Sequence, residues 1–239
     1  MSLKASEFHP NKNWHNWYIY DIYDYYLDKY SPYFKGTLVD LGCGEAPYKK
    51  YFLQFAKVYI GVDWTNTLHN SKADIVSNLN EKIMLEESSA DSIVSISVLE
   101  HLCEPQIFIN ESYRILKEDG VMVLQVPWQW WVHEEPYDYF RYTPFGLTYM
   151  FEKAGFTDIE VEAQSGFFTM IILKINYFTA RVRYIKGSRL WRWPMLAFFR
   201  IFWGIGQLLA PYLDKLDNNW DAESSGYFVV AHKKHKEDG

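Results

Sequence analysis

The chain has 239 residues, of which 49% are hydrophobic and 23% are charged, an ordinary composition for one α/β domain with a full core. Its formal net charge of −6 excludes a protein that binds the phosphate backbone of nucleic acid, because such proteins carry a basic surplus. The two cysteines, Cys43 and Cys103, cannot form a disulfide framework. The first residues show no basic and then apolar pattern of a signal peptide, so we expect a cytoplasmic protein.

Strand-like and helix-like patterns alternate along the chain. Aromatic and aliphatic residues within positions 1–35 recur at helical spacing and predict a helical cover. Strand-like runs follow at 37–41, 58–63, 73–76, 92–98 and 121–126. Helical patterns at 105–117 and 144–154 and strands at 158–164 and 226–232 complete the series. Because strands that alternate with helices form parallel sheets covered on both faces, residues 1–239 are predicted to form one doubly wound α/β domain.

Residues 167–216 interrupt this pattern before the last strand and differ in composition. From Ala163 to Leu213 there is no Asp or Glu. The same stretch holds seven of the 24 basic residues of the chain, namely Lys174, Arg181, Arg183, Lys186, Arg189, Arg192 and Arg200. The rest of the chain is therefore more acidic than the net charge suggests, and this segregation predicts a surface that meets a partner.

The run LVDLGCG, at residues 38–44, joins a buried strand to a glycine turn. In a doubly wound sheet the ligand lies across the carboxyl ends of the strands, and glycines at such a turn let the backbone approach it. Asp63 ends the next strand and can accept hydrogen bonds from ribose hydroxyls. A dinucleotide would need a third glycine where this sequence has Pro47, which disfavours a dinucleotide oxidoreductase. S-adenosylmethionine has no phosphate and does not need that glycine.

Five stretches in order, VDLGCG, IGVDW, ADIVSNL, SVLEHL and ESYRILKEDGVMVLQVP, resemble the successive motifs of the class I S-adenosylmethionine-dependent methyltransferases. The resemblance covers about residues 35–165, and GYFVVAH fits the antiparallel seventh strand of that family. It implies a Rossmann-like, mostly parallel seven-stranded sheet with S-adenosyl-L-methionine as the cofactor.

The resemblance also implies which residues hold the cofactor. They follow the first four strands and are Asp40, Gly42, Cys43, Gly44, Asp63, Trp64, Asn78, Leu79, Ser97 and Val98. Asp40 favours the methionine ammonium, Asp63 takes the ribose hydroxyls and Trp64 packs on the adenine. Asn78 stands where the family often has an acidic residue that faces the adenine amine, and Ser97 lies beneath the sulfonium.

Methyl transfer to a hydroxyl needs alignment of the acceptor and a group that accepts its proton, a role that suits histidine. His101 and His133 follow predicted strands, where an active site belongs. We favour His133 as the general base, oriented by Glu134 or Glu135, with His101 as the second candidate. A hydrogen-bonded loop with a purely structural role is the alternative. Some quinone-pathway relatives that resemble this stretch bind a divalent metal and have an additional carboxylate three residues before the position of Glu100. That position is Ser97 here, so no metal is predicted at Glu100 and His101.

Tyr137, Tyr139, Arg141 and Tyr142 are predicted to shape the acceptor pocket, because they belong to the same loop as His133. Aromatic residues make up 19% of the chain, which suits stacking against a glycan-like or other small-molecule acceptor. O-methylation is therefore the favoured activity. N-methylation and a non-catalytic protein that binds S-adenosylmethionine remain alternatives.

In residues 190–213, Arg200, Gly204 and Gln207 fall on one narrow helical face, and nearly everything else is apolar. Arg200 near the centre and the nearby Pro211 disfavour a membrane span. The 167–216 insertion is thus interpreted as a lid, a homodimer contact, an internal helix or a helix in a membrane surface. Basic residues beside Trp and Phe are typical of interfacial membrane binders, so peripheral membrane contact and a lipid-linked acceptor are hypotheses.

Overall fold

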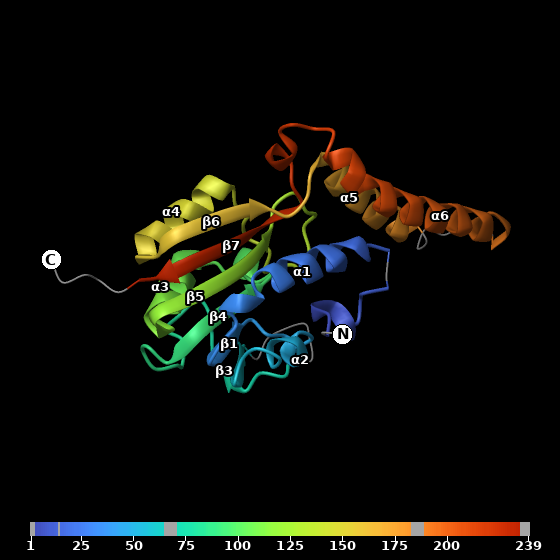
Figure 1. The fold of residues 1–239 in the computed structure, drawn as a ribbon. Coiled ribbons are helices and arrows are strands. Elements are labelled where there is room, and N and C mark those ends of the chain that lie inside the picture. The colour runs from blue at the N-terminus through green and yellow to red at the C-terminus, as the bar shows by residue number, and fades with distance from the viewer. Residues whose placement is uncertain (1–2, 14, 65–70, 183–188, 235–239) are drawn as a thin grey trace.

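A seven-stranded sheet forms the centre of the computed structural model, which describes residues 3–13, 15–64, 71–182 and 189–234 (Figure 1). Its strands are β1 (Thr37–Leu41), β2 (Val58–Asp63), β3 (Ile75–Val76), β4 (Ala90–Ile96), β5 (Leu116–Pro127), β6 (Thr157–Ala163) and β7 (Gly226–Lys233). The strand order is β3-β2-β1-β4-β5-β7-β6; β7 is antiparallel to β5 and β6, and the pairs from β3 to β5 are parallel. The predicted doubly wound, mostly parallel sheet is confirmed.

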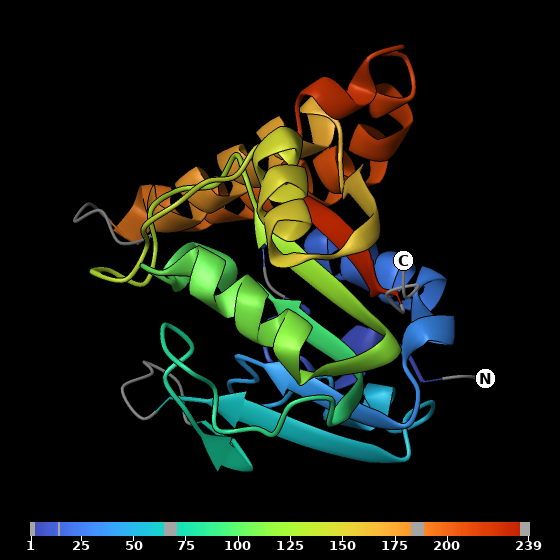
Figure 2. The same ribbon diagram turned by 90° about the vertical axis from the view of Figure 1, so that its left-hand side faces the viewer.

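Helices cover both faces of the sheet (Figure 2). The helices are α1 (Tyr18–Lys29), α2 (Lys49–Phe52), α3 (Pro105–Ile115), α4 (Pro144–Ala154), α5 (Phe167–Val182) and α6 (Arg189–Asp214). Short 3₁₀ turns are η1 (Ala5–Phe8), η2 (Ser31–Tyr33), η3 (Leu99–His101) and η4 (Trp220–Ala222). α1 packs on one face, where the Tyr26 ring stacks on Phe228 at 4.6 Å between ring centroids.

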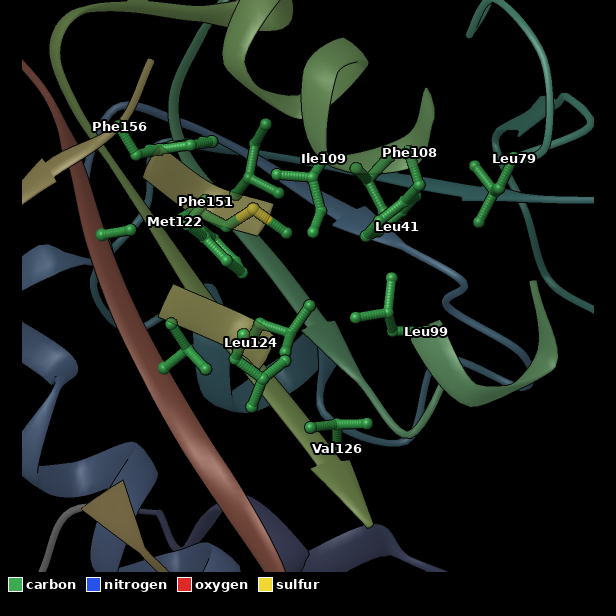
Figure 3. Packing of buried hydrophobic residues seen from close by; sticks show 14 of the residues in the cluster. Leu41, Leu79, Leu99, Phe108, Ile109, Met122, Leu124, Val126, Phe151 and Phe156 are labelled. Atoms are coloured by element: carbon green, nitrogen blue, oxygen red, sulfur yellow. The ribbon is translucent and has the colours of Figure 1, made fainter. Parts of the chain in front are cut away.

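The opposite face carries α3 and α4 over an apolar core. Phe108 and Ile109 of α3 and Phe151 of α4 are fully buried in one cluster with Met122 and Leu124 of β5 (Figure 3). α4 has the bounds predicted from the sequence, because Thr143 caps its first turn by accepting the Gly146 N–H at 3.2 Å and Gly155 ends it at φ 103°. This packing fixes β4 and β5, whose carboxyl ends carry the candidate site.

Several predicted boundaries need correction. The helix predicted at 105–117 ends at Ile115, since Leu116 is extended (φ −64°, ψ 138°) and begins β5. β4 begins at Ala90 and ends at Ile96, because Ser97 takes a left-handed conformation (φ 54°). The strand predicted at 73–76 is reduced to Ile75–Val76. Within positions 1–35, the α-helical part is α1 alone, preceded and followed by 3₁₀ turns.

The insertion at 167–216 folds as a helical hairpin. α5 and α6 lie side by side and project beyond the sheet near the amino-terminal end of α1 (Figure 1). Among the helices of the described chain, none is long and apolar enough to cross a membrane. The side chains of Arg183, Lys186, Arg189 and Arg192, which belong to the predicted basic set, lie outside the described residues.

Candidate active site

A cavity of about 1170 Å³ lies at the carboxyl ends of β1, β2, β4 and β5. All ten residues predicted to hold the cofactor line it: Asp40, Gly42, Cys43, Gly44, Asp63, Trp64, Asn78, Leu79, Ser97 and Val98. The candidate catalytic residues His101, His133 and Glu134 line the same cavity. The fold therefore brings the predicted cofactor residues and the predicted base to one place.

The turn after β1 requires glycine at two positions. Gly42 has φ 83°, and a Cβ there would lie 2.3 Å from Cγ2 of Val98. Gly44 has φ 51°, and a Cβ there would meet no atom within 4 Å, so this backbone borders open space. Both conformations favour glycine, and the turn leaves room for a ligand close to the main chain.

Asp63 ties the end of β2 to this glycine turn. Its Oδ2 accepts the Gly44 N–H at 2.8 Å, and its Oδ1 accepts the Trp64 N–H at 2.8 Å. A carboxylate is an acceptor with about four lone-pair sites, which is the chemistry that ribose hydroxyls require. The Trp64 ring stands edge-on to Tyr137, with 5.5 Å between ring centroids, and forms part of the wall that the adenine was predicted to meet.

Asp40 is a buried acid directly below the turn, with 5% of its surface exposed. Burial raises the pKa of Asp40 to about 7, and the charge of Asp63 raises it as well. The Tyr59 hydroxyl donates to Asp40 Oδ2 at 2.6 Å, and this hydrogen bond lowers the pKa of Asp40. A cation in the cavity would favour the charged carboxylate. The site thus fits the ammonium group that the sequence places there.

The floor of the cavity carries a polar chain that the sequence analysis missed. Ser97 Oγ donates to Gln125 Oε1 at 2.7 Å, Gln125 Nε2 donates to Gln164 Oε1 at 3.0 Å, and Gln164 Nε2 donates to Ser225 Oγ at 2.9 Å. Gln125 interrupts the otherwise apolar stretch VMVLQV of β5, and this polar residue in a buried strand is the signal that could have revealed the chain.

Asp138 is the carboxylate that the structure places against His133, whereas Glu134 or Glu135 was predicted to orient this ring. The Asp138 Oδ2 lies 3.3 Å from His133 Nδ1 and accepts the His133 backbone N–H at 2.9 Å. Arg141 donates to both oxygens of Asp138, at 2.6 and 2.7 Å, and holds the carboxylate in place. Burial raises the pKa of Asp138, but the hydrogen bonds from Arg141 and His133 outweigh it, so the pKa is lowered and the carboxylate stays charged.

His101 lies beside His133 in η3, with 4.8 Å between their ring centroids. Its Nδ1 is 3.0 Å from the Tyr137 carbonyl oxygen, and its Nε2 is 3.6 Å from Oε1 of Glu100 and 3.9 Å from Oε2 of Glu134. Burial lowers the pKa of His101, although the Glu134 charge acts in the opposite direction. His101 is therefore a neutral neighbour of His133 at the same end of the cavity.

Glu100 is fully buried, and neither carboxylate oxygen has a hydrogen-bond partner among the described residues. Glu100, His101 and His133 each offer one ligand atom, and these atoms lie within 4.8 Å of one another. This is the one group of at least three such residues that the described chain brings together in this way, and its donor set would suit a divalent metal.

Two of the four predicted acceptor residues line the cavity, and two do not. Tyr137 and Tyr139 belong to its wall. Arg141 is engaged with Asp138, and the buried Tyr142 donates its hydroxyl to the Leu99 carbonyl oxygen at 3.1 Å, so both support the loop instead. Glu135, which precedes a cis proline, does not line the cavity either.

An aromatic wall that the sequence analysis did not assign borders the cavity. The Trp131 ring lies 3.9 Å from that of Trp130 and stacks on Tyr177 of α5 at 3.2 Å between centroids and an interplanar angle of 10°. His15 and Tyr23, from the amino-terminal segment, complete this side. The segments 1–35 and 167–216 therefore both contribute to the cavity.

Residues 39–124 match the family model described as "Methyltransferase domain". A curated protein of Mycolicibacterium smegmatis, with the printed name "Probable S-adenosylmethionine-dependent methyltransferase", is 28% identical over 96 residues, which are 38% of this chain and 37% of that protein. The match thus spans little more than a third of the relative's length.

Solved structures agree with this match. A SAM dependent methyltransferase from Archaeoglobus fulgidus superposes with a TM-score of 0.57 at 18% identity, covering 89% of this chain and 94% of that one. Phosphoethanolamine N-methyltransferase 2 of Haemonchus contortus, solved with S-adenosyl-L-methionine, gives 0.53 at 19% identity and covers 84% of this chain and 49% of that one. Residues 39–124 therefore match a methyltransferase domain, and the chain has the fold of S-adenosylmethionine-dependent methyltransferases, whose cofactor is S-adenosylmethionine.

Proposed function

We propose that this protein transfers a methyl group from S-adenosylmethionine to a hydroxyl group of a small-molecule or glycan-like acceptor. The observation that carries the proposal is the position of His133. Its imidazole is backed by Asp138 and borders the same cavity as Gly42, Gly44 and Asp63. A proton acceptor and a cofactor cradle in one cavity are the two parts that O-methylation requires.

The residues of the chain divide the work as follows. Asp40 and the Gly42–Gly44 backbone hold the methionine end, and Asp63 holds the ribose. When bound there, S-adenosylmethionine supplies a methyl group that its sulfonium already activates. Nδ1 of His133 faces Asp138 and the Trp131 carbonyl oxygen, so Nε2 is the nitrogen that takes the acceptor proton. The charged Asp138 stabilises the imidazolium that forms.

The aromatic wall supports a ring-shaped acceptor. Trp130, Trp131 and Tyr177 present stacked aromatic groups along one side, and Tyr137 and Tyr139 stand on another. Aromatic faces bind the apolar faces of sugar rings and planar aromatic groups, while Glu134 and the histidines can accept their hydroxyl protons. A glycan carried on a lipid would meet the same requirements.

Glu134 also favours a second candidate, an amine acceptor, because a carboxylate near the reaction centre would attract an ammonium group. The experiment that separates the two is an acceptor screen with methyl-labelled S-adenosylmethionine and matched hydroxyl and amine compounds, including free and lipid-linked glycans. We expect label on hydroxyl oxygen with the wild type and little with His133→Ala. Transfer to the amines alone would replace the proposal with N-methylation.

A further inference from the structure

The outer face of α6 is apolar from Phe198 to Tyr212. Exposed residues recur at helical spacing on that face and are Phe198, Ile201, Ile205, Leu208, Leu209 and Tyr212. A helix on the surface of a protein in water normally turns its polar residues outward. Scattered exposed apolar residues need no explanation, but a continuous row of six indicates a contact surface.

Two polar residues of α6, Gln207 and Asp214, are buried and fix the orientation of the helix. The buried Gln207 donates to the carbonyl oxygens of His15 and Trp203, both at 3.0 Å, and accepts the Tyr18 N–H at 3.0 Å. At the carboxyl end, Asp214 accepts backbone N–H groups at the start of α5, including that of Phe168 at 2.8 Å. These bonds hold the hairpin with its apolar side outward.

An apolar groove follows the same side of the hairpin between α5 and α6. Its volume is about 370 Å³, and its lining includes Ile172, Phe198, Phe202, Ile205 and Leu209. A groove lined in this way fits hydrocarbon chains. It adds concave apolar surface to the exposed row of α6.

The charges of the hairpin identify the partner. Residues 163–213 contain no acid, and Arg181 of α5 and Arg200 of α6 are both exposed on the hairpin. A symmetric contact between two copies would place this cationic segment against itself, with no carboxylate of the segment to offset the repulsion. An anionic lipid surface offers both complements, since headgroup phosphates attract the basic residues and acyl chains receive the apolar row.

We propose that the α5–α6 hairpin lies in the interface of an anionic membrane, with the outer face of α6 inserted among the acyl chains. Tyr177 of α5 stacks on Trp131 at the cavity wall, so docking would place the cavity beside the headgroup layer. An acceptor of amphiphilic chemistry, with a polar head and a hydrocarbon anchor, could then reach the cavity without leaving the bilayer. Vesicle binding requires no methyl transfer and is tested separately from the proposed activity.

Co-sedimentation of the full chain with vesicles tests this proposal. Vesicles of phosphatidylcholine alone are compared with vesicles that also contain phosphatidylglycerol, at low and at high salt. We expect binding to the anionic vesicles that weakens with salt. Arg181→Gln and Arg200→Gln should each reduce that binding about fivefold, the effect of removing one basic residue at an anionic surface.

The triple variant Ile201→Gln, Ile205→Gln, Leu208→Gln should reduce vesicle binding by at least about tenfold, because it removes the inserting side chains. Met84, Phe145 and Tyr149 are exposed residues remote from the hairpin in sequence, and their triple Gln variant is the matched control that should bind like the wild type. Calorimetric titration with S-adenosylmethionine checks that every variant is folded. The proposal would be overturned if the wild type stayed out of the vesicle pellet at low salt. It would also be overturned if the wild type bound no vesicles but formed a dimer in solution that the hairpin triple variant dissociates.

Discussion

The Asp138 carboxylate lies 3.3 Å from Nδ1 of His133 and also accepts the backbone N–H of the same residue at 2.9 Å. One carboxylate thus fixes both the ring and the main chain of the candidate base. Arg141, which donates to both Asp138 oxygens, holds the carboxylate in turn. In the proposed mechanism, His133 therefore has the chemical role and Asp138 the positioning role.

His133→Ala should leave S-adenosylmethionine affinity unchanged and lower kcat by about 10²–10⁴, the usual effect of removing a general base. The affinity is measured by calorimetry and kcat with the acceptor found in the screen. His101→Ala is the matched control on the neighbouring ring and should cost much less. Full activity of the His133 variant with an unchanged pH–rate profile would leave the loop with a structural role.

Asp138→Asn should lower kcat by about tenfold or more while the KM for the acceptor changes little, because the imidazolium loses its charged partner. The pH–rate profile is the decisive measurement. A positioning role changes the pH dependence of kcat, whereas a merely structural role lowers activity equally at every pH. Asp138→Glu, which keeps the charge, should restore part of the rate.

Asp63→Ala should weaken S-adenosylmethionine binding by about 1–3 kcal/mol, the scale of hydrogen bonds to a charged group. Part of this loss comes from the released N–H groups of Gly44 and Trp64, so Asp63→Asn, which can still accept one of them, should show a smaller loss. Equal affinity of the wild type and the properly folded Ala variant would remove Asp63 from the cofactor site.

The predictable part of the fold rests on strong periodicity and clear end signals. α4 was predicted at about 144–154, and Gly155 marks its end in the sequence as in the structure. The end of α3 was missed because Leu116 and Lys117 continue an apolar-polar pattern that suits a helix or a strand equally well. The cofactor residues were found together since they share the carboxyl ends of consecutive parallel strands.

The partner of His133 could not be predicted, because Glu134, Glu135 and Asp138 are all close to it in sequence. Which of them faces the ring depends on the loop path, including the cis Glu135–Pro136 bond and the pairing of Asp138 with Arg141. The stacking of Tyr177 on Trp131 joins positions 46 residues apart on different elements, and nothing local in either segment signals it.

Glu100 gives a stability prediction with a definite sign. Burial, aided by the charges of Asp138 and Glu134, raises the pKa of Glu100 to about 8 against the effect of Arg141. Its protonated form is favoured on folding, so this stabilisation is full below the ordinary pKa of 4.5 and is lost as the pH rises to about 8. Glu100→Gln should remove a slope of up to about 1.4 kcal/mol per pH unit from the free energy of unfolding in that window.

Urea unfolding at several pH values measures this slope in the wild type and the variant. The exposed Glu118→Gln is the matched control and should keep the wild-type dependence. An identical slope in the wild type and in Glu100→Gln would show that Glu100 is already charged in the folded protein at neutral pH.

Tyr177→Ala should raise the KM for a ring-shaped acceptor by about tenfold and change kcat less, because it removes one side of the stacked wall. Tyr149→Ala on the exposed side of α4 serves as the control and should have wild-type kinetics. A lower kcat with an unchanged KM would mean that Tyr177 acts on the loop of His133 and not on the acceptor.

Calorimetric titration of the purified chain with S-adenosylmethionine, with NAD as the comparison, tests the central claim most directly. The Gly42–Gly44 turn, Asp40 and Asp63 predict saturable binding of one S-adenosylmethionine per chain and no binding of NAD, because Pro47 occupies the position of the third glycine. Two results would contradict the assignment of this cavity to methyl transfer. One is that S-adenosylmethionine gives no binding heat over a range of temperatures, and the other is that NAD binds saturably in its place.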